Sequence, residues 1–240
     1  MKTQFISLCL FLSCSVVLMG QEKVDVKPHK DGFFQGKTGN QDVSGYYLDG
    51  LKEGEWVTWY PTGVPNRIES FRKGHLDGAV VVFDSRGYIT SLGYYYNDSL
   101  NGRFIEYNRG NKLLSDKYYK MGKLEGIAKI YYDNGKLQEE SFYSDGLKNG
   151  TTTWYDQEDH KIAEYSYKDG FLNGLNRTYY PNGNLKTEDE HKNGKRNGIF
   201  KEYYEDGILK TEGQYSDDMK SGTWRTFSNE GEVISKEKMK

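Results

Sequence analysis

The chain has 240 residues, of which 33 are basic and 35 are acidic, so its formal net charge is −2. This near balance argues against a nucleic-acid partner, because binding of that kind depends on a clustered basic surface. With 21 Tyr, 11 Phe and 4 Trp in a chain that is only 35% hydrophobic, apolar burial has to come largely from aromatic rings, which favours thin sheets over a deep aliphatic core.

The first twenty residues have the layout of an export signal. Lys2 alone supplies positive charge, residues 5–19 are apolar apart from Ser and Cys, and Gly20 ends the run. The run is shorter than the roughly 20 apolar residues that a membrane helix needs. We therefore expect a signal peptide over residues 1–20, cleaved near Gly20, with lipidation of Cys14 as the alternative. Either route predicts an exported protein in the periplasm, at the cell surface or outside the cell.

Export would also simplify the chemistry of the mature chain. Cys9 and Cys14 both lie in the signal, so we expect neither a disulfide framework nor a thiol nucleophile after cleavage. Removing Lys2 leaves 32 basic residues against 35 acidic ones, a net charge of −3. No later apolar stretch is long enough to cross a bilayer, so we expect no integral membrane segment in the mature chain.

Residues 21–47 are expected to be an N-terminal leader and cap that contains a degenerate repeat. Within it, Lys30 to Gly36 (KDGFFQG) resembles the turn of the later units, but the strand that should follow is not evident. Terminal repeats of an array are usually atypical, because they cover the first exposed edge of the sheet.

From residue 48 to residue 239 the sequence repeats eight times with a period of 24 residues. Each unit has one glycine and, five residues later, one aromatic residue. The glycines, which we interpret as structural turn residues, are Gly54, Gly78, Gly102, Gly126, Gly150, Gly174, Gly198 and Gly222. The aromatic residues are Trp59, Phe83, Tyr107, Tyr131, Tyr155, Tyr179, Tyr203 and Phe227.

Two further columns follow the same period. A second glycine occurs at Gly63, Gly87, Gly135, Gly183, Gly207 and Gly231, with Asn111 and Asp159 in the other two units. A second aromatic column closes the unit at Phe71, Tyr95, Tyr119, Tyr143, Tyr167 and Tyr215, with His191 and Met239 as exceptions.

Within one unit, two short runs rich in β-branched and aromatic residues flank Asp133-Asn134-Gly135. This pattern predicts a β-hairpin with Asn134-Gly135 as a two-residue type I′ loop. The connection to the next unit, residues 144–150, has two glycines four residues apart and is predicted to be a tighter loop. The fold class is therefore all-β, an elongated single-layer antiparallel meander of tandem 24-residue hairpins. Sixteen strands about 4.8 Å apart would span roughly 75 Å.

The predicted loop also fixes a register. It pairs Asp133 with Lys136, Tyr131 with Gln138 and Lys129 with Glu140, and equivalent steps pair Arg177 with Glu188 and Lys201 with Glu212. These opposite charges would flank the column of Tyr131, Tyr179 and Tyr203 on one face. The other face, which we expect to be drier, would carry Trp56, Phe104, Phe200, Trp224, Leu113, Leu137, Leu185, Leu209 and the terminal tyrosines. A bulge would change this assignment, because one residue of slip exchanges the faces.

The pattern G-x-W-x-x-Y-Y-x-N-G is nearly complete over residues 56–63 and 200–207. It resembles the bacterial variant of the MORN repeat, and the resemblance extends over residues 48–239. The resemblance implies a single-layer antiparallel sheet of hairpins that serves as a binding or scaffolding module. Some bacterial members of the family carry an antitoxin label, and eukaryotic arrays have been linked to phospholipid contact and self-association.

The aromatic column from Trp59 to Phe227 is the candidate binding surface, because rings on a polar-flanked sheet face can stack on sugars, peptides or glycan strands. The alternative is that the rings are simply the core of a thin sheet. A carboxylate column at Glu140, Glu164, Glu188 and Glu212 could hold Ca²⁺ or a cationic partner. We favour a cross-strand role for these four, because calcium takes six to eight oxygens that converge on one point.

No catalytic, metal or cofactor site is predicted. His29, His75, His160 and His191 fall at unrelated phases of the repeat, and no serine lies in a nucleophile-elbow context. The glycines precede strands and not helices, so no phosphate loop is indicated. We therefore expect an exported, non-catalytic scaffold that binds a protein or itself through a repetitive sheet surface. The alternative is a carbohydrate or cell-envelope binder that uses the aromatic ladder.

Overall fold

The computed structural model describes residues 30–239, so the expected signal peptide and Cys14 lie outside the described residues. This part of the chain contains no helix, and all of its strands belong to one sheet. The strands are β1 (Gly32–Thr38), β2 (Gln41–Leu48), β3 (Leu51–Trp59), β4 (Pro65–Arg72), β5 (His75–Phe83), β6 (Ile89–Tyr96), β7 (Ser99–Tyr107), β8 (Leu113–Lys120), β9 (Lys123–Leu124), β10 (Gly126–Tyr131), β11 (Leu137–Ser144), β12 (Leu147–Tyr155), β13 (Lys161–Lys168), β14 (Phe171–Leu172), β15 (Gly174–Tyr179), β16 (Leu185–Lys192), β17 (Lys195–Tyr203), β18 (Leu209–Ser216), β19 (Met219–Phe227) and β20 (Val233–Lys238).

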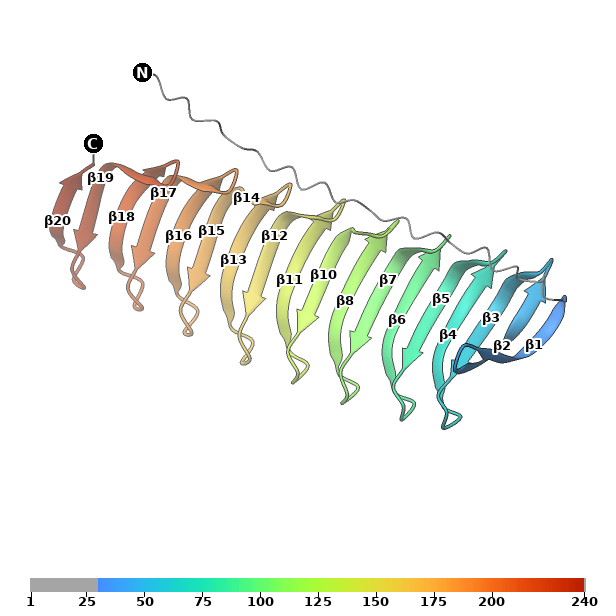
Figure 1. Cartoon of the computed structure of the whole chain (residues 1–240). Coiled ribbons are helices and arrows are strands. Elements are labelled where there is room, and N and C mark those ends of the chain that lie inside the picture. Colours follow the sequence, from blue (N-terminus) through green and yellow to red (C-terminus); the bar gives the residue numbers. More distant parts are fainter. Residues whose placement is uncertain (1–29, 240) are drawn as a thin grey trace, which may run out of the picture.

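Consecutive strands pair antiparallel along the whole sheet. β9 and β10 both pair with β8, and β14 and β15 both pair with β13, so each couple forms one strand interrupted at Glu125 or Asn173. Figure 1 shows the hairpins side by side in a single twisted row, with their tips along one edge and the connections between units along the other. The predicted fold class, a single-layer hairpin meander, is confirmed.

The expectation that the leader lacks the strand that should follow the turn at Lys30 to Gly36 is wrong, because β1 begins at Gly32 within that stretch. β1 and β2 form a complete hairpin, in which Gly36 pairs with Val43. The Phe34 ring reaches across β2 and stacks on Trp56 of β3, with ring centroids 6.1 Å apart. This contact is feasible because Gly45 lies beneath the Trp56 ring, where a Cβ atom would come within 2.3 Å of it. The hairpin therefore caps the array through its side chains as well as its backbone.

The hairpin tips are three-residue turns, so the predicted two-residue type I′ loop is wrong. The Tyr132 N–H donates to the Lys136 carbonyl (2.9 Å), and the Gly135 N–H donates to the Tyr132 carbonyl (2.8 Å). Gly135 has a φ of 90°, and Asn111 and Asp159 also have positive φ at the same position. Because Asn and Asp tolerate this conformation better than other non-glycine residues, the two exceptions in the second glycine column are explained.

A β-bulge in every unit offsets the longer turn. Tyr131 pairs with Leu137 and not with Gln138, but the register shifts at the next step and Lys129 pairs with Glu140 as predicted. Partners across a ladder point to the same face, so Leu137 lies on the face of Tyr131. Leu113, Leu185 and Leu209 have the same pairing. Their predicted placement on the opposite face is therefore wrong, and the bulge is the cause.

The type I′ geometry belongs to the connections between units. Met121 and Gly122 have φ values of 48° and 80°, and they join the paired residues Lys120 and Lys123. The glycines first interpreted as turn residues, from Gly54 to Gly222, lie instead within strands. There they have φ between 66° and 128°. They lie where the register shifts in the strand pairing between one unit and the next. Only glycine adopts such φ values at little cost.

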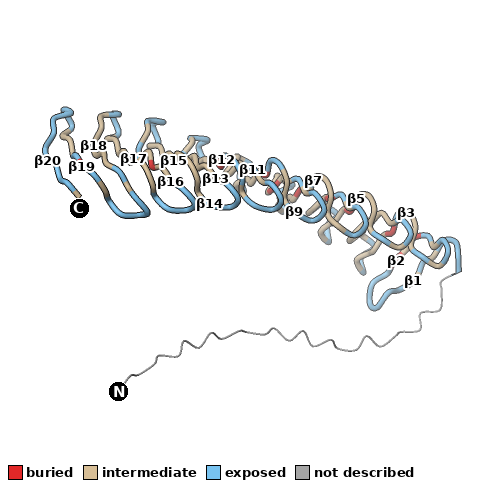
Figure 2. The backbone as a smooth tube through the Cα atoms, turned by 90° about the horizontal axis from the view of Figure 1, so that it is seen from above, coloured by how far each residue is buried: buried red, intermediate tan, exposed pale blue. Residues whose placement is uncertain are grey.

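The two faces of the sheet differ in packing. We call the face that carries Trp56, Val80, Phe104, Ala128, Thr152, Asn176, Phe200 and Trp224 the packed face, and the face with the column from Trp59 to Phe227 the open face. Apart from glycine, the buried residues in the described part of the chain lie on the packed face with one exception, Ile105. Figure 2 shows how few positions are buried. The prediction that this face is the drier one is confirmed.

Side chains that face each other between neighbouring units of the packed face complement each other in size. Glycine lies opposite a large ring at Gly45 and Trp56, at Gly93 and Phe104, and at Gly213 and Trp224. Where the central residue is small, as at Thr152, the opposite residue has a side chain, as at Ser141. Facing positions that alternate in this way can fill a layer one side chain deep without voids.

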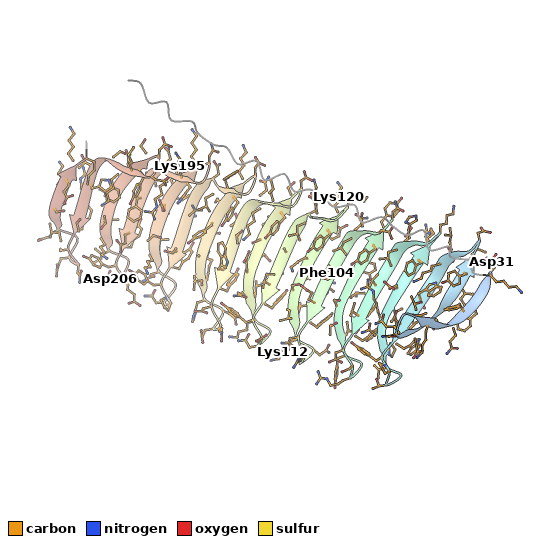
Figure 3. The ribbon with its side chains drawn as sticks, in the orientation of Figure 1. Asp31, Phe104, Lys112, Lys120, Lys195 and Asp206 are labelled. Carbon is orange, nitrogen blue, oxygen red and sulfur yellow. The ribbon has the colours of Figure 1, made fainter. Side chains whose placement is uncertain are left out.

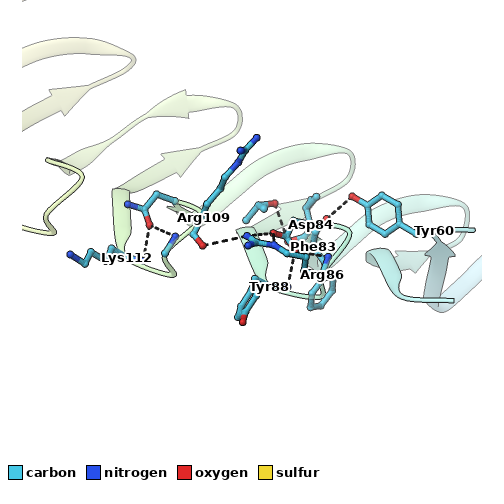
Figure 4. A network of polar contacts seen from close by, with 11 residues as sticks. Tyr60, Phe83, Asp84, Arg86, Tyr88, Arg109 and Lys112 are labelled. Atoms are coloured by element: carbon cyan, nitrogen blue, oxygen red, sulfur yellow. Dashed lines mark hydrogen bonds and ion pairs between the residues drawn. The ribbon is translucent and has the colours of Figure 1, made fainter. Parts of the chain in front are cut away.

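The hairpin tips are also tied to one another. The Tyr60 hydroxyl donates to the Phe83 carbonyl of the next unit (2.9 Å), and Tyr132, Tyr180 and Tyr204 make the equivalent bond. Figure 4 shows this contact beside the next tip, where Arg86 contacts both Asp84 and the Arg109 carbonyl. Each such hydrogen bond contributes about 0.5–1.5 kcal/mol, so the tips add to the coupling between neighbouring units.

Candidate functional site

The predicted binding column lies on the open face, one ring per hairpin. Every residue from Trp59 to Phe227 in this column is half-buried. The Tyr179 hydroxyl donates to Glu164 (3.1 Å) and the Tyr203 hydroxyl donates to Glu188 (3.4 Å), in each case one unit back. Burial raises the pKa of Tyr203 and of Tyr131. Each of these rings is therefore partly packed against the sheet and partly accessible to a ligand.

Ion pairs frame this column, largely as predicted. Lys129 contacts Glu140 (2.9 Å) and Arg177 contacts Glu188 (3.0 Å) across their hairpins. The hydrogen bond to Glu140 raises the pKa of Lys129. Glu212 differs, because its ion pair is with Arg225 of the next unit (2.8 Å), although its backbone pairs with Lys201.

The carboxylate column therefore has basic or hydroxyl partners at all four positions. Glu164 accepts from Tyr179 and lies 3.5 Å from Lys161, and the other three contact the cations just described. Within residues 30–239, no three His, Cys, Asp or Glu side chains come together as a metal site would require. The contacts support the cross-strand interpretation of Glu140, Glu164, Glu188 and Glu212.

A row of more exposed rings on the open face was missed. Tyr46, Tyr94, Tyr118 and Phe142 are 57%, 45%, 50% and 39% exposed. Tyr94, Tyr118 and Phe142 directly precede rings of the terminal column, and Tyr46 precedes Tyr47, the equivalent residue of the cap. Adjacent residues of a strand point to opposite faces. The doublets Tyr94-Tyr95 and Tyr118-Tyr119 are the signal that could have revealed the row. Figure 3 shows side chains along the sheet between the edges marked by Lys120 and Lys112.

The open face changes in character along the array. In the first units the positions beside the central column hold Val57, Ile68, Val81, Leu92 and Ile105, all half-buried or buried. From Asp116 onward the same positions hold charged residues except at Thr153, and most of these charges are paired, beginning with Asp116 and Arg103 (2.8 Å). The row of exposed rings is interrupted by Ser70, extends past Asp116 to Phe142, and continues as Ser166, Glu190 and Gln214. The N-terminal half of the open face is therefore apolar, and the C-terminal half is charged.

The described histidines, His75, His160 and His191, lie at separate places in the sheet and do not come together in one site. His75 contacts Asp98 (2.6 Å) and His160 contacts Asp156 (3.0 Å), each at an exposed turn. His29 lies outside the described residues. His191 replaces a terminal tyrosine on the packed face, where it joins a polar cluster with Asp189.

In this cluster, Arg196 Nε lies 2.8 Å from Asp189 Oδ2, and His191 Nε2 lies 3.9 Å from the same oxygen. Asn176 accepts from the Ser166 N–H (2.8 Å), which orients its amide to donate to His191 Nδ1 (2.7 Å). Burial raises the pKa of Asp189, although the charges of Arg196 and His191 oppose the shift. Asp189 Oδ1 is buried and has no hydrogen-bond partner among residues 30–239, a condition that typically costs about 1–3 kcal/mol.

These features define a class: a single-sheet repeat protein built from β-hairpins, with one packed and one open face. Four segments, residues 52–73, 124–145, 172–193 and 196–217, match the sequence model of the family described as MORN repeat variant. The chain therefore contains MORN repeats, and its other units repeat the same hairpin at the same period. No curated protein matches the chain. MORN repeats generally form non-catalytic scaffolds, which often bind proteins or membrane lipids. No helix within residues 30–239 is long and apolar enough to span a bilayer.

Proposed function

We propose that the protein is an exported, non-catalytic scaffold whose open face binds a protein partner, either another protein or a second copy of this chain. The observation that carries the proposal is the row of exposed rings at Tyr94, Tyr118 and Phe142, one per hairpin in three consecutive units. Aromatic residues are enriched in protein interfaces. Exposed apolar patches rimmed by polar residues mark interaction sites.

The partner docks on the N-terminal half of the open face. There Tyr94 and Tyr118 flank Val81, Leu92 and Ile105, so a partner can remove an apolar strip from water. Phe142 extends this strip beside the ion pair of Lys129 and Glu140. The charged half beyond Asp116 suits the rim of such an interface, because exposed ion pairs contribute little affinity but restrict which partners fit. The rigid ladder pre-organises the rings, which lowers the entropic cost of binding.

The test replaces the three rings with threonine, a residue with good strand propensity. The variant Tyr94→Thr/Tyr118→Thr/Phe142→Thr and the wild type are used to capture partners from the envelope fraction of the native cells. We expect at least tenfold less of the wild type's partner, because the loss of one hot-spot ring alone costs about 2 kcal/mol or more. The intact mass of the recovered chain also reports cleavage near Gly20 or lipidation at Cys14.

A matched control replaces exposed apolar residues at the edge that joins the units. Leu147, Phe171 and Met219 are 51%, 61% and 70% exposed, so Leu147→Thr/Phe171→Thr/Met219→Thr removes comparable surface elsewhere. The control should capture the partner as the wild type does. Equal capture by the ring variant, or equal loss by both variants while both stay folded, would contradict the assignment of the open face.

A further inference from the structure

The unit from Gly174 to Asp189 breaks the packing rule of the packed face. Elsewhere on this face charged side chains are paired with one another among rings, aliphatic groups and glycines, as Arg67 is with Glu69 and Lys117 with Glu106. Here Asn176 and Asp189 form the central pair, and His191 stands where most units have tyrosine or phenylalanine. Asp189 also lies opposite Phe200, where glycine faces Trp56, Phe104 and Trp224. A buried carboxylate thus lies opposite a large ring at a position where the three other units with a ring there have glycine.

This polar cluster lines a hollow of about 220 Å³ on the packed face. Its wall includes Tyr165, Thr178, Thr187, Asp189, His191 and Arg196. A single water needs far less room, since its share of liquid volume is about 30 Å³. The hollow therefore has space for a small molecule.

Asp189 supplies the polar anchor of the hollow. The residue is only 8% exposed, and its Oδ1 atom has no hydrogen-bond partner in the described structure. Arg196 holds the other oxygen. The terminal torsion of an aspartate side chain is soft, and the Arg196 side chain is 44% exposed. A hydrogen-bond donor in the hollow can therefore turn Oδ1 toward itself while Arg196 follows the movement of Oδ2. The cluster is complete except for that donor.

The other groups in the wall define the ligand's chemistry. Arg196 already balances the charge of Asp189, so a cation gains little here, and the buried carboxylate repels an anion. Thr178 and Thr187 contribute hydroxyl groups 2.6 Å apart. Tyr165 contributes a ring, which suits the apolar face of a sugar. We propose that the hollow at Asp189 binds one pyranose ring of a neutral sugar, with a sugar hydroxyl donating to Asp189 Oδ1.

This site is separate from the proposed protein interface. It lies on the packed face and in the C-terminal part of the array, whereas the exposed rings lie on the open face in the N-terminal part. The outcome of partner capture with the ring variant is therefore independent of sugar binding. A failure of the sugar test leaves the proposed protein interface unaffected.

The experiment uses residues 21–240 and the probes glucose, galactose, mannose and N-acetylglucosamine. Each is added at about 10 mM, tenfold above a Kd of about 1 mM, and ¹H–¹⁵N spectra are recorded. We expect at least one sugar to shift the amide signals of residues 165–196 in a saturable way. Asp189→Ser should weaken that binding at least tenfold, and His191→Tyr should do the same by filling the hollow. Both replacements already occur at the equivalent positions, as Ser141 and Tyr143, so both variants should fold.

Glu69→Ser is the matched control, because Glu69 has the same place in its unit but lies outside the hollow. It should bind the sugar as the wild type does. Absence of any saturable shift with the four sugars would overturn the proposal. So would unchanged binding by a folded Asp189→Ser variant, or shifts caused by inorganic phosphate and by none of the sugars.

Discussion

Replacing Trp56 with alanine is expected to lower the free energy of unfolding by about 3–5 kcal/mol, the usual cost of truncating a buried tryptophan. Trp56 is buried, with only 2% of the residue exposed. Its ring contacts Phe34 and Tyr47, and its indole N–H donates to the Tyr46 carbonyl (3.0 Å). One substitution therefore removes the side-chain anchor of the N-terminal cap.

The loss should be local in structure, because each unit of such an array contacts only its neighbours. Denaturant unfolding followed by circular dichroism gives the free energy, and hydrogen exchange shows where protection is lost. We expect the loss of protection to concentrate in β1 to β4. Trp59→Ala is the control, since Trp59 is half-buried on the open face, and it should cost less. A loss below about 1 kcal/mol for Trp56→Ala would contradict the anchoring role.

Replacing Gly213 with tyrosine is expected to destabilise the C-terminal units by about 1–3 kcal/mol or more, the cost of overpacking. A Cβ atom at Gly213 would lie 2.3 Å from the Trp224 ring. The ring cannot withdraw without exposing its apolar surface and losing the bond from its indole N–H to the Gln214 carbonyl (3.2 Å). The measurement is again denaturant unfolding of the purified chain.

The array itself supplies the compensating change. Tyr165 and Asn176 occupy the positions that correspond to Gly213 and Trp224. The double variant Gly213→Tyr/Trp224→Asn should therefore lose less stability than the sum of the losses measured for the two single variants. Residues in contact typically show coupling of about 0.5–3 kcal/mol in such a cycle. Strict additivity would show that size complementarity between neighbouring units does not govern the packed face.

The architecture could be predicted from the sequence because the 24-residue period indicates one hairpin per unit and the order of the hairpins in the sheet. The positions of Gly135 and Tyr131 within a unit placed the hairpin, and the pairing of Lys129 with Glu140 was correct. The pairing was correct because two features that were not predicted have opposite effects on the register. The tip is one residue longer than predicted, and a bulge beside Leu137 returns the register.

Features that depend on contacts between units were less accessible. Type I′ turns were assigned to the tips, because Asn134-Gly135 has the sequence that such turns favour, but they occur at connections such as Met121-Gly122. The second strand of the cap was missed because its fit depends on Trp56, a residue of the next hairpin. In the site, the column through Tyr131 was placed on the correct face, but the exposed Tyr118 was overlooked. The cluster around Asp189 needs spatial neighbours to be seen at all.

The most direct test of the repeat scaffold is deletion of one whole unit, Lys120 to Tyr143. Because the join restores the 24-residue phase, the shortened chain should keep the strand signal per residue and unfold cooperatively, with partner binding weakened but present. Deletion of residues 120–131 alone, which removes half a period, should instead disrupt the sheet. Complete unfolding of the 24-residue deletion would contradict a modular array in which each hairpin depends only on its neighbours.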